Sequence, residues 1–303
     1  MVWIITALAA AVVVSIANII DSHLLTKKMP SLVSFLIPMG LTQLIAAGIL
    51  LAVFPFPVNA GVLHILAIIG AASLNACCSI IVLNTLRKSE VSRVIPIIST
   101  GPIFVALLSI PLLSATLGYW QWLAVIMTVT GAILISLQRN RGDGKTKLHK
   151  SFFLLLLSAL VGAIASIGFK YGLKTIPFWN TYGITGICTG TIVLTYSLRK
   201  TNLLELKNLP QRTQKIGLVV GDQCIGIVSA ILAFKAMGLG PVSLVNALLN
   251  TRPVFVFIFS LVLSRFLPKI VNEPLHKNTA LLKFTAIAIM TAGIVIISLS
   301  TVK

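Results

Sequence analysis

The chain has 303 residues, of which 57% are hydrophobic and only 10% are charged, and its mean hydropathy is +1.03. A soluble domain carries about 25% charged residues, so this composition excludes a water-soluble globular protein and indicates an integral membrane protein. The net charge of +18 does not indicate a nucleic-acid partner, because the cations fall in short connections between apolar runs.

Ten apolar segments are long enough to cross a bilayer, which takes about 20 residues. The first segment lacks the basic start and the small-residue cleavage site of a signal peptide, so we expect it to be a membrane helix. In chain order the ten segments are residues 2–25, 31–54, 61–86, 92–113, 119–137, 151–173, 178–198, 215–237, 241–263 and 280–301.

The lysines and arginines are distributed unevenly between the two sides of the membrane. One set of alternating connections contains 19 of the 24 cations, and the other set, with the C-terminus, contains 4. Cationic connections stay in the cytoplasm. We therefore predict a multi-pass protein of the plasma membrane with its basic loops in the cytoplasm and both termini outside.

An internal repeat divides the chain into two halves. Residues 85–105 align without a gap with residues 236–256, at an offset of 151. Because each half contains five segments, an odd number, the second half enters the membrane from the opposite side. The sequence therefore predicts an all-α membrane protein of ten transmembrane helices, arranged as two inverted five-helix repeats. Many secondary transporters have this architecture, with the substrate site near the midplane. We assign residues 1–137 to the first repeat, 138–150 to a basic cytoplasmic linker and 151–303 to the second repeat.

A short motif recurs on the fourth helix of each repeat, where Val-Ser is followed some ten residues later by Pro, an aliphatic residue and Phe. It reads Val91-Ser92 to Pro102-Ile103-Phe104, and again Val242-Ser243 to Pro253-Val254-Phe255. Lys170 also precedes Pro177 by seven residues, and His23 precedes Pro30 by the same distance.

With these motifs, nearly the whole chain resembles the EamA type of the drug/metabolite transporter (DMT) superfamily. The resemblance implies export or exchange of small metabolites through a central cavity lined by the first, third and fourth helices of each half. The sequence departs from the family pattern at the ends of both fourth helices, which lack the frequent Gly-Glu pair. Ten-helix members of the family have both termini in the cytoplasm, the reverse of the orientation that the charges predict.

Arg252 places a charge inside an apolar segment, where the first repeat has Gly101. An ionised residue at membrane depth has a partner and is a functional candidate. One alternative is an ion pair with Asp222 on the neighbouring antiparallel segment, at a depth that differs from that of Arg252 by about 6 Å. The other is that the guanidinium binds a carboxylate or phosphate of the substrate, with Asp222 holding it in the empty state or carrying a coupling proton. Asp21, near the end of the first segment, is expected to have a wetted interfacial role.

Further polar residues are candidates for the walls of the cavity. Asn246 and Asn250 recur at helical spacing, and Arg252 lies about 200° around a regular helix from Asn250. Each further candidate would serve equally well in an interhelical hydrogen bond. These are Asn18, Asn75, Ser99, Thr100 and Gln223. Three small-residue pairs predict close helix packing, namely Gly168/Gly172, Gly186/Gly190 and Gly217/Gly221.

We expect a secondary transporter that exports a small polar metabolite, an amino acid or another anionic or amphoteric solute, by alternating access. A proton is the candidate coupling ion, and facilitative transport, a monomer and a homodimer all stay open. The alternatives are a multidrug or cationic-solute exporter using Asp222, and a non-transporting membrane protein that handles lipid or takes part in signalling. The chain contains no His-Glu-x-x-His, phosphate loop or paired acidic motif, and its four cysteines lack metal-site spacing. We therefore expect no enzyme activity and no cofactor.

Overall fold

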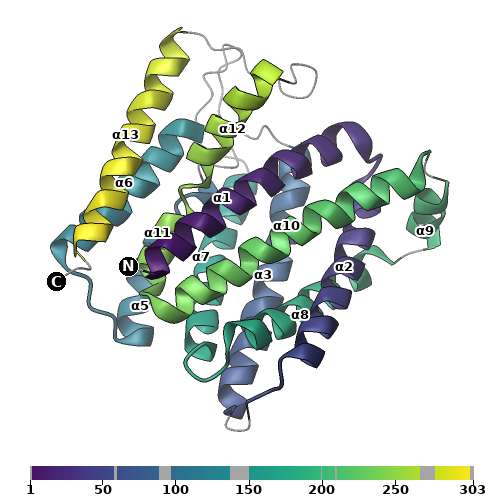
Figure 1. Cartoon of the computed structure of the whole chain (residues 1–303), viewed down its shortest axis with the longest axis horizontal. Coiled ribbons are helices and arrows are strands. Elements are labelled where there is room, and N and C mark those ends of the chain that lie inside the picture. Colours follow the sequence, from purple (N-terminus) through teal and green to yellow (C-terminus); the bar gives the residue numbers. More distant parts are fainter. Residues whose placement is uncertain are drawn as a thin grey trace.

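The structure is a computed structural model, and it describes residues 2–57, 60–88, 97–136, 150–198, 200–208, 210–266 and 277–300. These residues form helices joined by short turns, and no strand occurs among them (Figure 1). All of the predicted linker except Lys150 lies outside the described residues.

The helices follow the predicted segments closely. In the first half they are α1 (Val2–His23), α2 (Leu32–Val53), α3 (Val62–Lys88), α5 (Gly101–Leu113) and α6 (Tyr119–Ser136), with a π-helical turn η1 (Leu24–Lys28) after α1. In the second half they are α7 (Lys150–Gly172), α8 (Phe178–Ser197), α9 (Lys200–Lys207), α10 (Arg212–Leu239), α11 (Val242–Leu249), α12 (Arg252–Phe266) and α13 (Lys277–Ser300).

Three features differ from the prediction. The segment 92–113, predicted as one span, is interrupted by a turn at Ser99 and Thr100 before α5 begins. The segment 241–263, predicted as one span, consists of α11 and α12 with a break between them. The short helix α9 is an additional helix, in the connection between the predicted segments 178–198 and 215–237. It forms because Leu206 is buried with Ile37 of α2, while Glu205 accepts a hydrogen bond from the Ser34 hydroxyl at 2.9 Å.

The helices of the two halves pack against each other in equivalent pairs. The first helix of each half lies along the third helix of the other, so α1 packs on α10 and α7 packs on α3. The second helices, α2 and α8, pack together, and so do the fifth helices, α6 and α13, which run side by side in Figure 1. This is the pairing expected of two repeats related by a pseudo-two-fold axis.

Glycines allow two of these pairs to approach closely. A Cβ at Gly168 would lie 3.0 Å from the Ala71 side chain on α3, and one at Gly190 would lie 2.9 Å from the Gly40 carbonyl on α2. The close packing predicted for Gly168/Gly172 and Gly186/Gly190 is thereby confirmed. The same prediction for Gly217/Gly221 is wrong, because a Cβ at either position would meet no atom within 4 Å.

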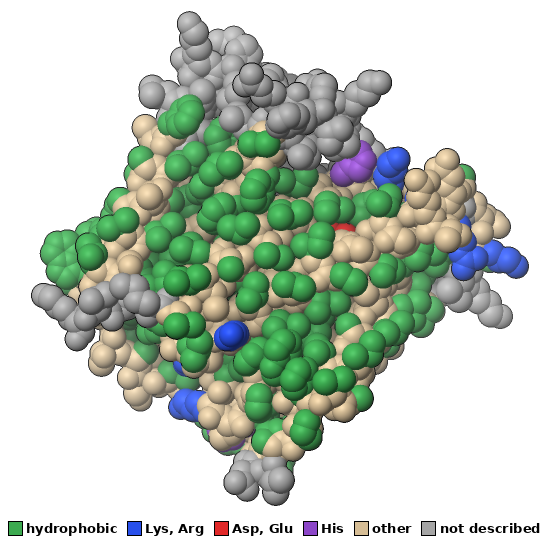
Figure 2. Space-filling model, viewed as in Figure 1, with side chains coloured by type: hydrophobic (Ala, Val, Ile, Leu, Met, Phe, Trp, Pro, Cys, Tyr) green, Lys and Arg blue, Asp and Glu red, His purple; other side chains and the backbone are tan. Residues whose placement is uncertain are grey.

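The outer surface is strongly apolar. Hydrophobic side chains cover most of the face shown in Figure 2, and the lysines and arginines visible there are few. Large side chains on this surface include Ile5 on α1 and Ile45 on α2, which are 67% and 64% exposed. Within the described residues, six helical segments are long and apolar enough to cross a membrane, and shorter apolar helices accompany them. The protein is a multi-pass membrane protein.

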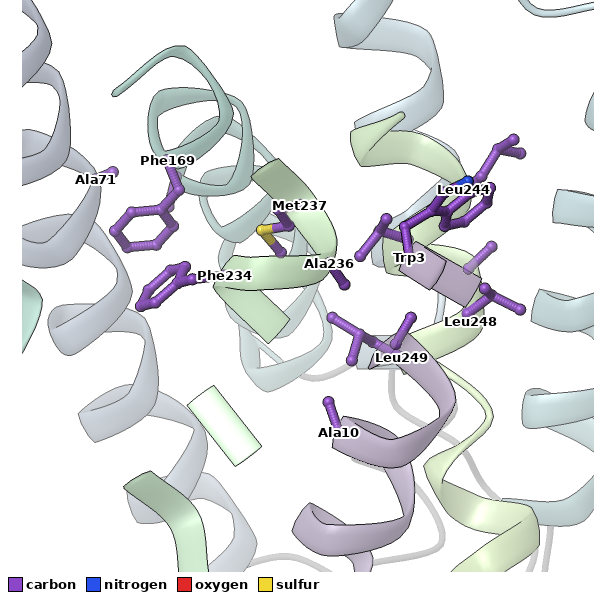
Figure 3. Close-up of a cluster of buried hydrophobic side chains, with 14 of the residues drawn as sticks. Trp3, Ala10, Ala71, Phe169, Phe234, Ala236, Met237, Leu244, Leu248 and Leu249 are labelled. Atoms are coloured by element: carbon purple, nitrogen blue, oxygen red, sulfur yellow. The ribbon is translucent and has the colours of Figure 1, made fainter. Parts of the chain in front are cut away.

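The largest buried cluster joins both halves near the start of α1 and the end of α10 (Figure 3). Trp3 of α1 lies against Leu244 of α11, and Phe169 of α7 meets Phe234 of α10 edge to face, with ring centroids 5.0 Å apart. Gly240 allows the indole of Trp3 to approach, since a Cβ there would lie 2.6 Å from the ring. This core joins α1, α7, α10 and α11 across the two halves.

Candidate functional site

Both repeats interrupt a helix at the same position. In the second repeat, α11 ends at Leu249, Thr251 lies in a turn, and α12 begins at Arg252. In the first repeat, Ser99 and Thr100 form the turn that precedes α5. Each new helix then starts with proline in its first turn, a position that proline tolerates because its missing N–H has no intrahelical partner there.

The two interruptions use the same hydrogen bonds. The hydroxyl of Thr100 donates to the carbonyl of Ile97 at 2.7 Å, and the hydroxyl of Thr251 donates to the carbonyl of Leu248 at 2.7 Å. These four residues are equivalent in pairs at the offset of 151. A threonine hydroxyl that satisfies a carbonyl at a helix break offsets the cost of the lost backbone bond in the membrane interior.

The two interruptions also touch each other. The side-chain amide of Asn250 donates to the backbone carbonyl of Ser99 at 2.9 Å, and these residues are 151 positions apart. Equivalent residues of two repeats meet where the axis that relates the repeats passes between them. Both residues are candidates predicted from the sequence, and the structure brings them together.

Arg252 is the first residue of α12, and its side chain is exposed. Its guanidinium forms no ion pair with a described residue, so the Asp222–Arg252 pair is not formed. The comparison of Arg252 with Asn250 on a single helical wheel is also wrong, because the turn at Thr251 interrupts the helix between them. Ser15 of α1 ties this point to the first half by donating to the carbonyl of Arg252 at 3.1 Å.

Asp222 contacts a different residue from the one predicted. Its side-chain carboxyl group contacts the side-chain carboxyl group of Asp21, which belongs to α1. The side-chain amide of Gln223 donates to Oδ2 of Asp222 at 3.1 Å. Asp222 is only 2% exposed. Asp21 itself is only partly buried, close to the end of α1, and the interfacial role expected of it stays a prediction. The sequence offered one signal, since Asp21 and Asp222 are the two acids within the apolar segments, but it did not show that α1 packs on α10.

The remaining predicted residues lie apart from these contacts. Asn246 accepts a hydrogen bond from Ser166 of α7 at 3.4 Å and donates to the carbonyl of Val242 at 2.9 Å, so it joins helices. Asn18 on α1 and Asn75 on α3 are exposed, and their contacts do not place them with Arg252. They stay candidates on the evidence of their position alone.

Lys170, which precedes Pro177 by seven residues, caps the end of α10. Its ammonium donates to the carbonyls of Met237 at 2.7 Å, Gly240 at 2.9 Å and Gly238 at 3.3 Å. A cation at a helix C-terminus satisfies carbonyls that have no intrahelical partner. Its role here is to hold α7 against α10.

A pocket of about 230 Å³ opens beside this capped end, between the α7–α8 turn and α10. None of the predicted site residues lines it. Its walls are Leu173, Ile176, Pro177, Phe178, Lys235, Gly238 and Leu239. Among the described residues, no group of three His, Cys, Asp or Glu side chains could hold a metal ion.

Comparisons with known proteins agree with this architecture. A solved structure described as "Crystal structure of protein" is similar over 98% of this chain and 95% of its own length, with a TM-score of 0.66 and 16% sequence identity, which shows the fold alone. No curated protein matches the chain. The model of the EamA-like transporter family matches residues 1–137. By this match, the first half of the chain is similar to the EamA-like transporters of the drug/metabolite transporter superfamily.

Proposed function

We propose that the protein exports a small polar metabolite, an amino acid or another solute with an anionic group, by alternating access between two inverted five-helix repeats. The two repeats would be residues 1–137 and 151–303, giving ten membrane crossings in which α11 and α12 together form one. Support comes from the equivalent packing of α1 on α10 and of α7 on α3. The repeated helix breaks at Thr100 and Thr251 support the same arrangement.

The observation that carries the proposal is that the guanidinium of Arg252 has no carboxylate partner among the described residues. Arg252 is the first residue of α12, directly after a helix break. Discontinuous helices of transporters direct their positive N-termini at anionic substrate groups. An arginine at such a position adds a planar pair of donors that fits a carboxylate or phosphate.

The orientation is part of the proposal. We place the protein in the plasma membrane with its basic connections in the cytoplasm. In this orientation α9 would lie at the cytoplasmic surface of the membrane. In Figure 1, α1 begins and α13 ends at the opposite side from α9. We also propose that transport is export and that it is coupled to protons instead of being facilitative. The proposal holds for a monomer or a homodimer.

A thermal-shift screen of the purified protein tests this function, because a ligand that binds only the folded state raises the unfolding temperature. Amino acids, carboxylates and organic phosphates are the first set, and quaternary ammonium compounds are the second. We expect stabilisation by the first set in the wild type and its loss in Arg252→Gln. Stabilisation by the cations alone, retained in Arg252→Gln and lost in Asp222→Asn, would replace the proposal with the cationic-solute alternative.

A further inference from the structure

We infer that the carboxyl pair of Asp21 and Asp222 is a binding site for a single proton, held between the two halves of the transporter. Asp21 belongs to α1 in the first half and Asp222 to α10 in the second. These helices pack along each other and lie side by side in Figure 1. The assignment of this proton as the coupling ion rests on the proposed function, but the site itself does not.

The pair lacks the groups that would stabilise two negative charges. Oδ1 of Asp21 and Oδ1 of Asp222 are both buried, and neither has a hydrogen-bond partner among the described residues. Asp222 as a whole is 98% removed from solvent, since its exposed fraction is 2%. Its Oδ2 receives a neutral amide donor, Gln223, instead of a cation.

Two of the elements that surround the pair contain no charged residue. Helices α2 and α11, which pack against α10 and α1, contain no charged residue in their described ranges. Arg252 on α12 is exposed and forms no ion pair with either acid. The other titratable or charged side chains that the structure describes on the adjoining elements are His23 on α1, Lys28 on η1, Lys170 and Tyr171 on α7, Tyr182, Cys188 and Tyr196 on α8, and Arg212, Lys215, Cys224 and Lys235 on α10 itself.

Two carboxylates in contact within a low-dielectric interior cannot both be ionised, so the pair titrates as a unit and retains one proton. A shared proton also supplies the hydrogen bond between two groups that are otherwise both acceptors. The proton enters from water and binds one carboxylate oxygen. It leaves by the same route when the contact between α1 and α10 opens.

The repeat provides a comparison within the same molecule. By the offsets of 147 for α1 and 151 for α10, the equivalents of Asp21 and Asp222 are Gly168 and Ala71. These residues meet at the α7–α3 crossing, where a Cβ on Gly168 would lie 3.0 Å from the Cβ of Ala71. The same crossing therefore packs without any polar group, and the carboxyl pair is not needed to join the helices. Its presence at one crossing alone indicates a role in binding.

Because the two halves move relative to each other in alternating access, a proton held between them is bound in one arrangement and released in another. The pair thus gives the proposed transport cycle a coupling site that is separate from Arg252. No covalent step is involved, and the charge of the pair changes by one with each proton.

Infrared spectroscopy of the purified full-length protein tests the site with the proton itself as the probe. The wild type is expected to show the C=O stretch of a protonated carboxyl group at neutral pH, with a shift on exchange into heavy water. Two double variants remove the pair: Asp21→Asn with Asp222→Asn keeps side chains that can hydrogen-bond, and Asp21→Gly with Asp222→Ala copies the opposite crossing. Glu205→Gln is the control, because Glu205 lies outside the pair and contacts Ser34.

We expect loss of the band in whichever double variant folds, as judged by its unfolding transition, and no loss in Glu205→Gln. Absence of the band from the wild type, or its persistence in a folded double variant, would overturn the proton site. The measurement needs no substrate, so a ligand screen that finds no binder refutes the proposed function and leaves the infrared result standing. Binders found for a protein without the band would refute the proton site alone.

Discussion

The amide of Asn250 and the carbonyl of Ser99 are joined by a 2.9 Å hydrogen bond, although the residues lie 151 positions apart. That separation equals the repeat offset, so the bond joins equivalent points of the two halves. It also joins the two helix breaks, each of which is closed by its own threonine. Any movement of one half against the other that separates these breaks must break or rebuild this bond.

Asn250→Leu is expected to reduce transport strongly and to lower the free energy of unfolding by only about 1 kcal/mol, the usual net value of such a bond. Transport in proteoliposomes and thermal unfolding in detergent measure the two effects. Asn84→Ala is the control, because the bond of Asn84 to Tyr196 at 3.3 Å lies at the surface. Equal transport by the Asn250 and Asn84 variants would remove the bond from the mechanism.

Arg252→Gln is expected to change the free energy of unfolding by less than about 1 kcal/mol, since no ion pair is lost. Breaking a buried pair would instead cost about 3–5 kcal/mol. Arg252→Lys keeps the charge and loses the planar fork, so it should fold normally and bind an anionic ligand more weakly. Thermal unfolding with and without ligand measures both quantities.

Arg212→Gln, at the exposed start of α10, is the matched control for Arg252→Gln. The two should have similar stability in the absence of ligand. A large loss confined to the Arg252 variant would show that its guanidinium has a protein partner after all and would contradict the assigned role.

Substitution by alanine should affect the free energy of unfolding differently at two glycines, Gly190 and Gly221, each of which belongs to a small-residue pair in the sequence. A Cβ at Gly190 would lie 2.7 Å from Leu44 and 2.9 Å from the Gly40 carbonyl, whereas one at Gly221 would meet nothing within 4 Å. Gly190→Ala should lower the free energy of unfolding by about 1–3 kcal/mol through overpacking of α8 on α2. Gly221→Ala should be neutral or slightly stabilising, because alanine favours a helix. Comparable losses in both variants would contradict the packing described.

Orientation follows from the cation count and is tested by thiol labelling in intact cells. A cysteine placed in the 140–147 stretch should resist an impermeant reagent, and one added after Lys303 should react. The background must lack the native cysteines, because Cys77 and Cys224 are exposed. Labelling of the 140–147 position alone would establish the orientation with both termini in the cytoplasm.

Composition and the length of the apolar runs were sufficient to identify the long helices of this protein, but not α9 or the break between α11 and α12. A membrane span needs about 20 apolar residues in sequence, so the bounds of α2, α6, α8 and α13 agree with the predicted segments to within a few residues. The repeat was equally visible, because equivalent positions retain residues such as Thr100 and Thr251. These are local properties of the chain, and no packing is needed to recognise them.

The partners of the polar residues were decided by the tertiary structure alone. From the sequence, the predicted segments 215–237 and 241–263 form a hairpin, and this hairpin made Arg252 the expected partner of Asp222. Adjacent segments were the only pairs whose depths in the membrane could be compared. The fold instead places α10 against α1, from the other half of the chain, and the turn at Thr251 redirects the helix that carries Arg252. Contacts between distant segments depend on which helices pack together, and for this reason the Asp21–Asp222 pair and the Asn250–Ser99 bond emerged only from the folded molecule.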